Sequence, residues 1–236
     1  MGAFEQERKR LFIGRKTTAK ERLETVNWAV DNKYDTLVFS LNDRFFKRRV
    51  NAEYAKLAKK HGFFIEAGGS DMSLLLHRRF FLFHRDLFRM ELGKRSSNHH
   101  FCPTNPETTS RITARARFLF SRAMVFMTEP RIFHLLPDEG NEQTWCACPA
   151  CRAFTPAEQN LIAVSSAADA LLGLDPDARL SFLDLYMEPE TNDPQVDEPE
   201  DFEPQVFEPQ VRGIAPRKNM FRLSSSPLGH QNEPQE

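Results

Sequence analysis

Short apolar runs alternate with amphipathic stretches along most of this chain. Runs at 11–14 and 36–41 are typical of buried strands, and Leu23, Val26 and Val30 recur between them at the spacing of a helix face. Because parallel neighbours in a sheet need a crossover connection, this strand–helix–strand order predicts a parallel sheet.

The pattern continues with four more strands and three more helices. The strands are predicted at 63–67, 132–136, 180–187 and 211–215. The helices are predicted to start near Asn51, at the Asn105–Pro106 cap and at the Thr155–Glu158 capping box. About six parallel strands with interleaved helices predict an α/β fold, specifically an incomplete or atypical (β/α)8 TIM barrel.

Charge is unevenly distributed along the chain, although the net charge is -1. Residues 1–131 carry 26 Lys+Arg against 14 Asp+Glu, and residues 132–236 carry 6 against 19, which gives +12 and -13. We expect one barrel domain over 8–222, an acidic Pro-rich loop at 191–210 within it, and a disordered tail at 223–236.

The sequence carries no signal for a membrane or for export. No apolar run approaches the roughly 20 residues that cross a bilayer, and the first ten residues, MGAFEQERKR, contain no apolar signal-peptide region. We therefore expect a cytoplasmic protein with no membrane partner, whose cysteines stay reduced or hold a metal. A six-stranded open sheet has edges that need cover, and a homo-oligomer could supply it.

All the cysteines fall in two short motifs, a lone Cys-Pro and a Cys-x-Cys-x-x-Cys cluster. They are Cys102, Cys146, Cys148 and Cys151. Four thiolates would complete a tetrahedral zinc site, which would be structural because no coordination position stays open. His99 and His100 are alternative ligands. The alternatives to a metal are reduced, partly buried thiols, or disulfides in exported relatives.

Acidic residues follow two of the predicted strands. Asp138 and Glu139 stand before Gly140 after one strand, and Glu188 ends another, with Asp184 deeper on it. Acids at the carboxyl end of parallel strands reach the mouth of a barrel, where a glycosidase needs two carboxylates about 5–10 Å apart. We expect Asp138, Glu139 and Glu188 to be the catalytic residues. The alternative is a simple turn with a structural ion pair.

Four further residues are candidate substrate ligands. They are Glu66, Arg95, Trp145 and Arg217. Either arginine could meet a sugar carboxylate, and the tryptophan could line the cleft that holds the sugar.

Several longer segments resemble one bacterial family, in the same order along the chain. They are GFFIEAGG, FHRDLFRMELGKR, FCPTNPE, LLPDEG with WCACPACRAFTPAEQ, PDARLSFLDLY and APRKNMF. The chain is similar to the barrel family called domain of unknown function 4838, which is grouped with the (β/α)8 glycoside hydrolases near alpha-glucuronidases and beta-hexosaminidases. Two positions depart from that pattern, Ser70-Asp71 in place of a His and Asp138-Glu139 in place of Asp-Asp. The resemblance implies a barrel with a carbohydrate ligand.

Three classes of function remain open. The first is a glycoside-hydrolase-like barrel, a possible glycosidase, that acts on or binds a carbohydrate. The second is a catalytically inactive shortened barrel with a structural metal or a thiol-rich loop. The third, which has the least support, is a nucleic-acid binder that uses the Arg- and Phe-rich segment 77–95 without any recognised nucleic-acid motif.

Overall fold

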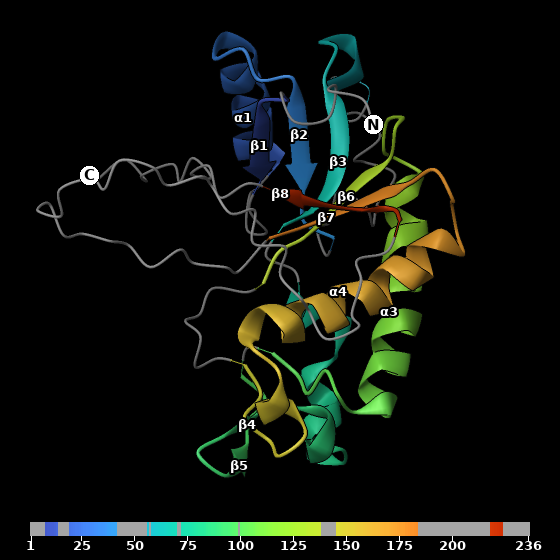
Figure 1. Cartoon of the computed structure of the whole chain (residues 1–236). Coiled ribbons are helices and arrows are strands. Elements are labelled where there is room, and N and C mark those ends of the chain that lie inside the picture. The colour runs from blue at the N-terminus through green and yellow to red at the C-terminus, as the bar shows by residue number, and fades with distance from the viewer. Residues whose placement is uncertain are drawn as a thin grey trace, which may run out of the picture.

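A parallel sheet forms the centre of the structure, a computed structural model that describes residues 8–13, 19–41, 56, 58–69, 72–98, 100–137, 145–183 and 218–223. Its strands are β1 (Arg10–Ile13), β2 (Thr36–Phe39), β3 (Phe64–Gly69), β6 (Ile132–Leu135), β7 (Arg179–Leu183) and β8 (Met220–Leu223). Every neighbouring pair is parallel, and the strands follow one another in the order β1-β2-β3-β6-β7-β8 (Figure 1).

This strand order decides the fold class. A doubly wound sheet reverses its strand order at a switch point, whereas in a (β/α) barrel each strand is added beside the previous one. The observed order never reverses, so the sheet is of the barrel type. In the described part of the chain it holds six strands where a closed barrel of this type has eight, and β1 and β8 are its outer strands. The predicted incomplete α/β barrel is confirmed.

Within the described residues, three long helices pack on the sheet, and shorter turns connect them. They are α1 (Ala19–Asp31), α3 (Pro106–Met124) and α4 (Pro156–Leu172). The 3-10 turns are η3 (Met72–Leu75), η4 (Arg78–Leu82), η5 (Arg85–Leu87) and η7 (Cys151–Ala153), and β4 (Met90–Glu91) pairs with β5 (Lys94–Arg95) as a small hairpin. No helix in the described part of the chain combines the length and apolar character that crossing a bilayer needs.

Local signals set the helix starts as expected. The Asn105 side chain accepts from the Glu107 N–H with Pro106 at the first helical position. Thr155 and Glu158 form a complete capping box at the start of α4. Both caps satisfy backbone N–H groups that an α-helix leaves without a partner.

The two faces of the sheet differ in chemistry. Alternate strand residues such as Leu37, Ile65, Phe133 and Leu180 belong to the apolar core with the helices, and Phe133 lies 4.5 Å from the Phe120 ring of α3. The opposite face carries the polar side chains of Arg10, Glu66, His134 and Ser181, together with apolar ones such as Phe12 and Val38. Because side chains alternate along a strand, this second face is the one that would line the inside of the barrel.

The predicted strands match the sheet except at its end. The fifth predicted strand, 180–187, is β7, and its residues 184–187 lie outside the described part of the chain. The sixth was predicted at 211–215, which also lies outside it, as do the acidic loop at 191–210 and the tail from 224. The sixth described strand is β8, which pairs with β7.

Candidate metal centre and barrel-interior network

Two loops leave the sheet side by side at its carboxyl edge. β3 and β6 are neighbours, and just beyond their paired residues the Leu136 N–H donates to the Gly69 carbonyl at 3.0 Å. The loop after β3 carries the β4–β5 hairpin, and the loop after β6 carries the cysteine cluster. Residues 77–98, 100–105 and 145–155 from these loops form a small unit, the cysteine lobe, at the end of the molecule that holds β4 and β5 in Figure 1.

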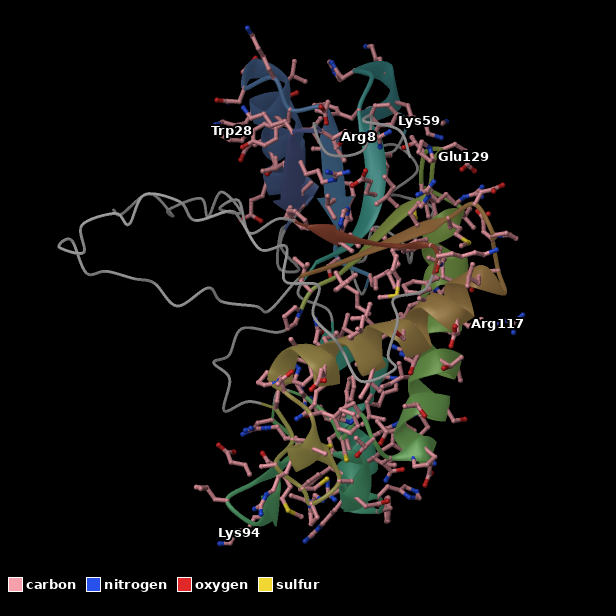
Figure 2. All side chains as sticks on the ribbon, viewed as in Figure 1. Arg8, Trp28, Lys59, Lys94, Arg117 and Glu129 are labelled. Carbon is pink, nitrogen blue, oxygen red and sulfur yellow. The ribbon has the colours of Figure 1, made fainter. Side chains whose placement is uncertain are left out.

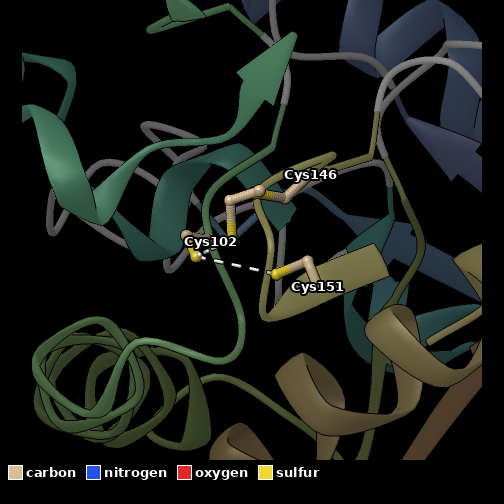
Figure 3. A group of neighbouring side chains, drawn as sticks. Cys102, Cys146 and Cys151 are labelled. Atoms are coloured by element: carbon tan, nitrogen blue, oxygen red, sulfur yellow. Dashed lines mark hydrogen bonds between the residues drawn. The ribbon is translucent and has the colours of Figure 1, made fainter. Parts of the chain in front are cut away.

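The four cysteine sulfurs gather inside this lobe. All four thiols are buried and free of disulfide bonds, and their Sγ atoms lie within 4.8 Å of one another. The Cys102 Sγ atom is 3.7 Å from Cys148 Sγ. It is 3.6 Å from Cys151 Sγ (Figure 3). With metal–sulfur bonds of about 2.3 Å, the corners of a tetrahedron lie about 3.8 Å apart. The spacing and the donor set therefore fit a bound metal ion.

Hydrogen-bond donors surround the sulfurs. The Met90 N–H donates to Cys146 Sγ at 3.2 Å, and the Thr104 hydroxyl lies 3.1 Å from Cys151 Sγ. The Arg95 Nη1 atom adds a positive charge 3.8 Å from Cys146 Sγ. Burial lowers the pKa of Arg95, but the neighbouring thiolates raise it more. Donors in this second layer orient thiolate ligands and stabilise their charge.

The thiols share negative charge unequally. Hydrogen bonds with the Cys146 and Cys151 thiols hold the pKa of Cys102 far below its usual range. The contact with Cys102 is the largest cause that raises the pKa of Cys146 to about 11, and it raises the pKa of Cys151 as well. One thiolate is thus stabilised by its thiol neighbours. A cation at the centre would favour the thiolate form of all four.

Gln159 of α4 fixes the cysteine loop to the helix. Its Oε1 atom accepts from the Cys146 N–H at 3.1 Å. Its Nε2 atom lies 3.1 Å from the Cys146 carbonyl, 3.3 Å from that of Cys151 and 3.3 Å from that of Phe154. The side chain is 3% exposed, so these contacts are shielded from water. The Gln159 amide therefore fixes the loop at Cys146, Cys151 and Phe154. Gln159 lies outside the Cys-x-Cys-x-x-Cys motif.

Two predicted substrate ligands, Arg95 and Trp145, also belong to this lobe. The buried Trp145 ring stacks on His100, with ring centroids 4.3 Å apart and an interplanar angle of 12°. Arg95 donates to the Phe88 carbonyl at 2.6 Å. The group of sulfurs does not include His100, and His99 lies outside the described residues. Both candidates thus have partners inside the lobe, and a role in substrate binding stays a prediction for them.

Glu66 lies on the polar face of the sheet, in the third position of β3. Its carboxylate accepts from Arg10 Nε at 2.7 Å and Nη2 at 3.4 Å, from Arg8 Nη1 at 3.1 Å and from His134 Nε2 at 2.6 Å. A carboxylate offers about four lone-pair sites, so these four contacts use its capacity. The side chain is fully buried. Its predicted role in substrate binding remains untested.

Burial and the neighbouring groups shift the pKa values of Glu66 and His134. Burial raises the pKa of Glu66, but the hydrogen bonds and charges of His134 and Arg10 lower it more, to about 2. Burial also lowers the pKa of His134. The ring lies between two partners, with Nε2 2.6 Å from the Glu66 carboxylate and Nδ1 2.6 Å from the Ser181 hydroxyl. The chain β1–β3–β6–β7 is linked by these side chains across the inside of the sheet.

Gly68 makes the close approach of β3 and β6 possible. A Cβ atom at this position would lie 1.9 Å from the His134 carbonyl oxygen. Its backbone φ of +131° is also one that residues other than glycine rarely adopt. The glycine therefore allows the backbone contact that places His134 beside Glu66.

The structure describes only some of the site residues that the sequence predicted. The structure brings the four cysteines together, as predicted. Asp138, Glu139, Glu188, Asp184 and Arg217 lie outside the described residues. The barrel-interior network of His134 and Ser181 was not predicted. Its signal was present as one polar residue in an apolar strand, Glu66 in FFIEAGG and His134 in RIFHLL.

The fold and these sites define an α/β protein of the (β/α)-barrel type with a thiol cluster at the carboxyl edge. Among solved structures, the chain is similar to the GH20 catalytic modules of the pneumococcal exo-beta-D-N-acetylglucosaminidase, with a TM-score of 0.52 and 12% identity over 75% of this chain and 54% of that one. At this identity the likeness shows a shared fold.

Two further structures show weaker likeness. One is the alpha-galactosidase from Lactobacillus brevis, with a TM-score of 0.47 and 10% identity over 76% of this chain and 27% of that one. The other is the beta-N-acetylhexosaminidase from Bacteroides fragilis, with a TM-score of 0.45 and 14% identity over 75% and 41%. This chain thus spans between 27% and 54% of the three structures.

Sequence comparisons add no family. No protein-family model matches the chain, and no curated protein matches it. The structural likeness thus supports the (β/α)-barrel fold alone. Membership of the family called domain of unknown function 4838 is not confirmed.

Proposed function

We propose that this barrel takes a carbohydrate at the carboxyl edge of its sheet and that Asp138, Glu139 and Glu188 supply the acids there. The observation that carries the proposal is the sequential parallel sheet, whose strand β6 ends at Leu135, three residues before Asp138. In barrels with this strand order, ligands bind at the carboxyl edge. The shared fold with a GH20 module supports a sugar as the ligand.

The spacing of the strands suits two-carboxylate chemistry. β6 and β7 are direct neighbours, and adjacent strands lie about 4.8 Å apart. Acids that follow these two strands start from points close to the separation of about 5–10 Å that glycoside hydrolysis uses. In this proposal Glu139 is the general acid, Glu188 is the second carboxylate, and Asp138 orients a substrate hydroxyl.

Hydrolysis of a panel of nitrophenyl glycosides, with hexosaminides, galactosides and glucuronides, tests the proposal. Glu139→Gln should abolish turnover while the thermal unfolding curve stays unchanged. Glu107→Gln is the matched control, because Glu107 lies at the start of α3 and its carboxylate pairs with Arg111 on the surface of that helix. Unchanged turnover in Glu139→Gln would remove Glu139 from the mechanism.

A second candidate is a shortened barrel that binds a sugar without cleaving it. The saturated state of Glu66 favours it, because the one described carboxylate inside the sheet already accepts four hydrogen bonds from the chain itself. Titration calorimetry with the same sugars separates the two candidates. Binding with no turnover by any substrate in the panel would support the second.

We further propose that the thiol cluster holds one structural zinc ion. Cys102, Cys146, Cys148 and Cys151 would supply all four ligands, which leaves no position for substrate or water. The ion would join the loop after β3 to the loop after β6. Elemental analysis of purified protein should find about one zinc per chain, and Cys148→Ser should lower that content. Iron in place of zinc, or no metal, would contradict this assignment.

A further inference from the structure

Arginines from two separate segments form one continuous surface. Arg111, Arg115, Phe118 and Arg122 recur along α3 at i, i+4, i+7 and i+11, which places them on one side of the helix. Arg79 and Phe80 of η4 lie against the start of this row, because both Arg79 and Arg111 contact the Phe80 ring. We call these six residues the basic stripe. At about 1.5 Å per residue, its helical part is about 16 Å long.

The positive charge of this stripe is largely uncompensated. Arg111 pairs with Glu107, whereas Arg79, Arg115 and Arg122 form no ion pair with a carboxylate of the described residues. Burial lowers the pKa of Arg115, and the charges of Arg122 and Arg79 lower it further. The arginines therefore repel one another. An anion on the stripe would relieve that repulsion.

The aromatic rings of the stripe hold the guanidinium groups. Phe118 is contacted by Arg115 at 5.2 Å and by Arg122 at 5.3 Å, and Phe80 by Arg111 at 4.5 Å and Arg79 at 5.5 Å. Such contacts stabilise a cation on an exposed ring. Single-stranded nucleic acids need free aromatic faces for base stacking, and here arginines occupy both rings. The stripe thus presents charge rather than stacking surfaces.

We propose that the basic stripe binds an anionic polysaccharide, with carboxylate or sulfate groups on the guanidinium groups. The choice of a sugar polymer rests on the proposed function, and the anionic class rests on the stripe itself. A guanidinium group matches a carboxylate or sulfate through two parallel hydrogen bonds. The stripe runs along α3, on the helix-covered side of the sheet, and begins at η4 in the cysteine lobe.

Binding of polygalacturonate to the full chain, measured by titration at several salt concentrations, tests the proposal. Wild type should bind it, with an affinity that falls as salt rises. Arg79→Gln, Arg115→Gln and Arg122→Gln combined should weaken binding about tenfold or more. The matched control replaces three exposed lysines with Gln: Lys56, Lys59 and Lys60. This control removes the same amount of positive charge. Lys59 lies near the end of the molecule opposite the cysteine lobe, which carries Lys94 (Figure 2).

A second variant tests whether weaker binding results from loss of stability. The Arg115 Nε atom lies 3.4 Å from the Leu74 carbonyl, so its replacement can loosen the helix. Arg79→Gln with Arg122→Gln leaves that contact in place, and its unfolding curve should match wild type while binding still weakens. Equal weakening in the lysine control would overturn the proposal, as would equal binding of uncharged dextran.

Three further outcomes separate this inference from nucleic-acid binding and from the proposed catalysis. Tighter binding of oligo(dT) than of polygalacturonate would overturn the polysaccharide and assign the stripe to nucleic acid. Polygalacturonate binding that depends on the stripe arginines, with no effect of Glu139→Gln on any reaction, would support the binding role of the stripe. It would contradict the proposed catalysis. Hydrolysis of neutral glycosides without polygalacturonate binding would support the proposed catalysis and overturn the proposed role of the stripe.

Discussion

Glu66 of β3 and His134 of β6 are joined by a 2.6 Å hydrogen bond between Oε2 and Nε2, both fully buried inside the sheet. The two residues are 68 positions apart in the chain. Their contact is possible because Gly68 lets the two backbones approach each other. Through Arg10 the contact is extended to β1, and through Ser181 it is extended to β7.

Glu66→Ala should destabilise the fold by about 3–5 kcal/mol, because it removes the buried carboxylate that accepts from both Arg10 and His134. Denaturant unfolding followed by circular dichroism gives the free energy of unfolding. Glu107→Gln, which removes a half-exposed helix-surface pair with Arg111, should cost less than about 0.5 kcal/mol. Equal losses in the two variants would mean that the Glu66 network contributes no more than a surface pair.

Stability should fall in acid in two stages. Burial holds the pKa of His134 below 6.5, so the unfolded chain gains a proton first and stability declines below pH 6.5. The Glu66 pKa is lowered from 4.5 to about 2, so the stability that its charge contributes is complete above 4.5 and is lost as pH falls toward about 2.

Unfolding free energies measured across this pH range check both stages. Glu66→Gln should remove the decline between pH 4.5 and about 2, relative to wild type, and His134→Gln should remove the earlier decline. A wild-type slope that persists unchanged in Glu66→Gln would show that other carboxylates cause the acid transition.

Gln159→Ala should weaken zinc binding about 10–100-fold while leaving all four thiols in place, because the loop would lose the amide contacts that orient it. Competition with a coloured chelator measures the zinc affinity. Ser166→Ala is the control on the same helix, since its hydroxyl bonds only to the Ile162 carbonyl within α4. An unchanged affinity in Gln159→Ala would show that the cysteine loop orients itself.

Gly68→Ala should prevent folding or cost more than about 4 kcal/mol, because the new Cβ would overlap the His134 carbonyl oxygen. Gly62→Ala provides the comparison. It has a positive φ of +79° but no atom within 4 Å of the added Cβ, so it should cost only about 1–2 kcal/mol. Thermal unfolding of both variants separates backbone strain from steric overlap. Similar losses would place the whole cost in the backbone conformation.

Sequence patterns were sufficient wherever a signal acts over a few residues. The Asn105–Pro106 and Thr155–Glu158 caps were predicted and form as expected, because each depends on groups within three or four positions. The cysteine cluster was also predicted, since three thiols in six residues leave few arrangements. Strand β8 was missed at 220–223, where the sequence NMFRL lacks a long apolar run.

By itself the sequence determined the alternation of strands and helices, the parallel class of the sheet and the gathering of the thiols. Only the tertiary structure decided that Glu66, His134 and Ser181 meet and that arginines of η4 and α3 share one surface. The physical reason is distance along the chain. Register between strands and packing between helices set which remote side chains meet, and no short stretch of sequence encodes either.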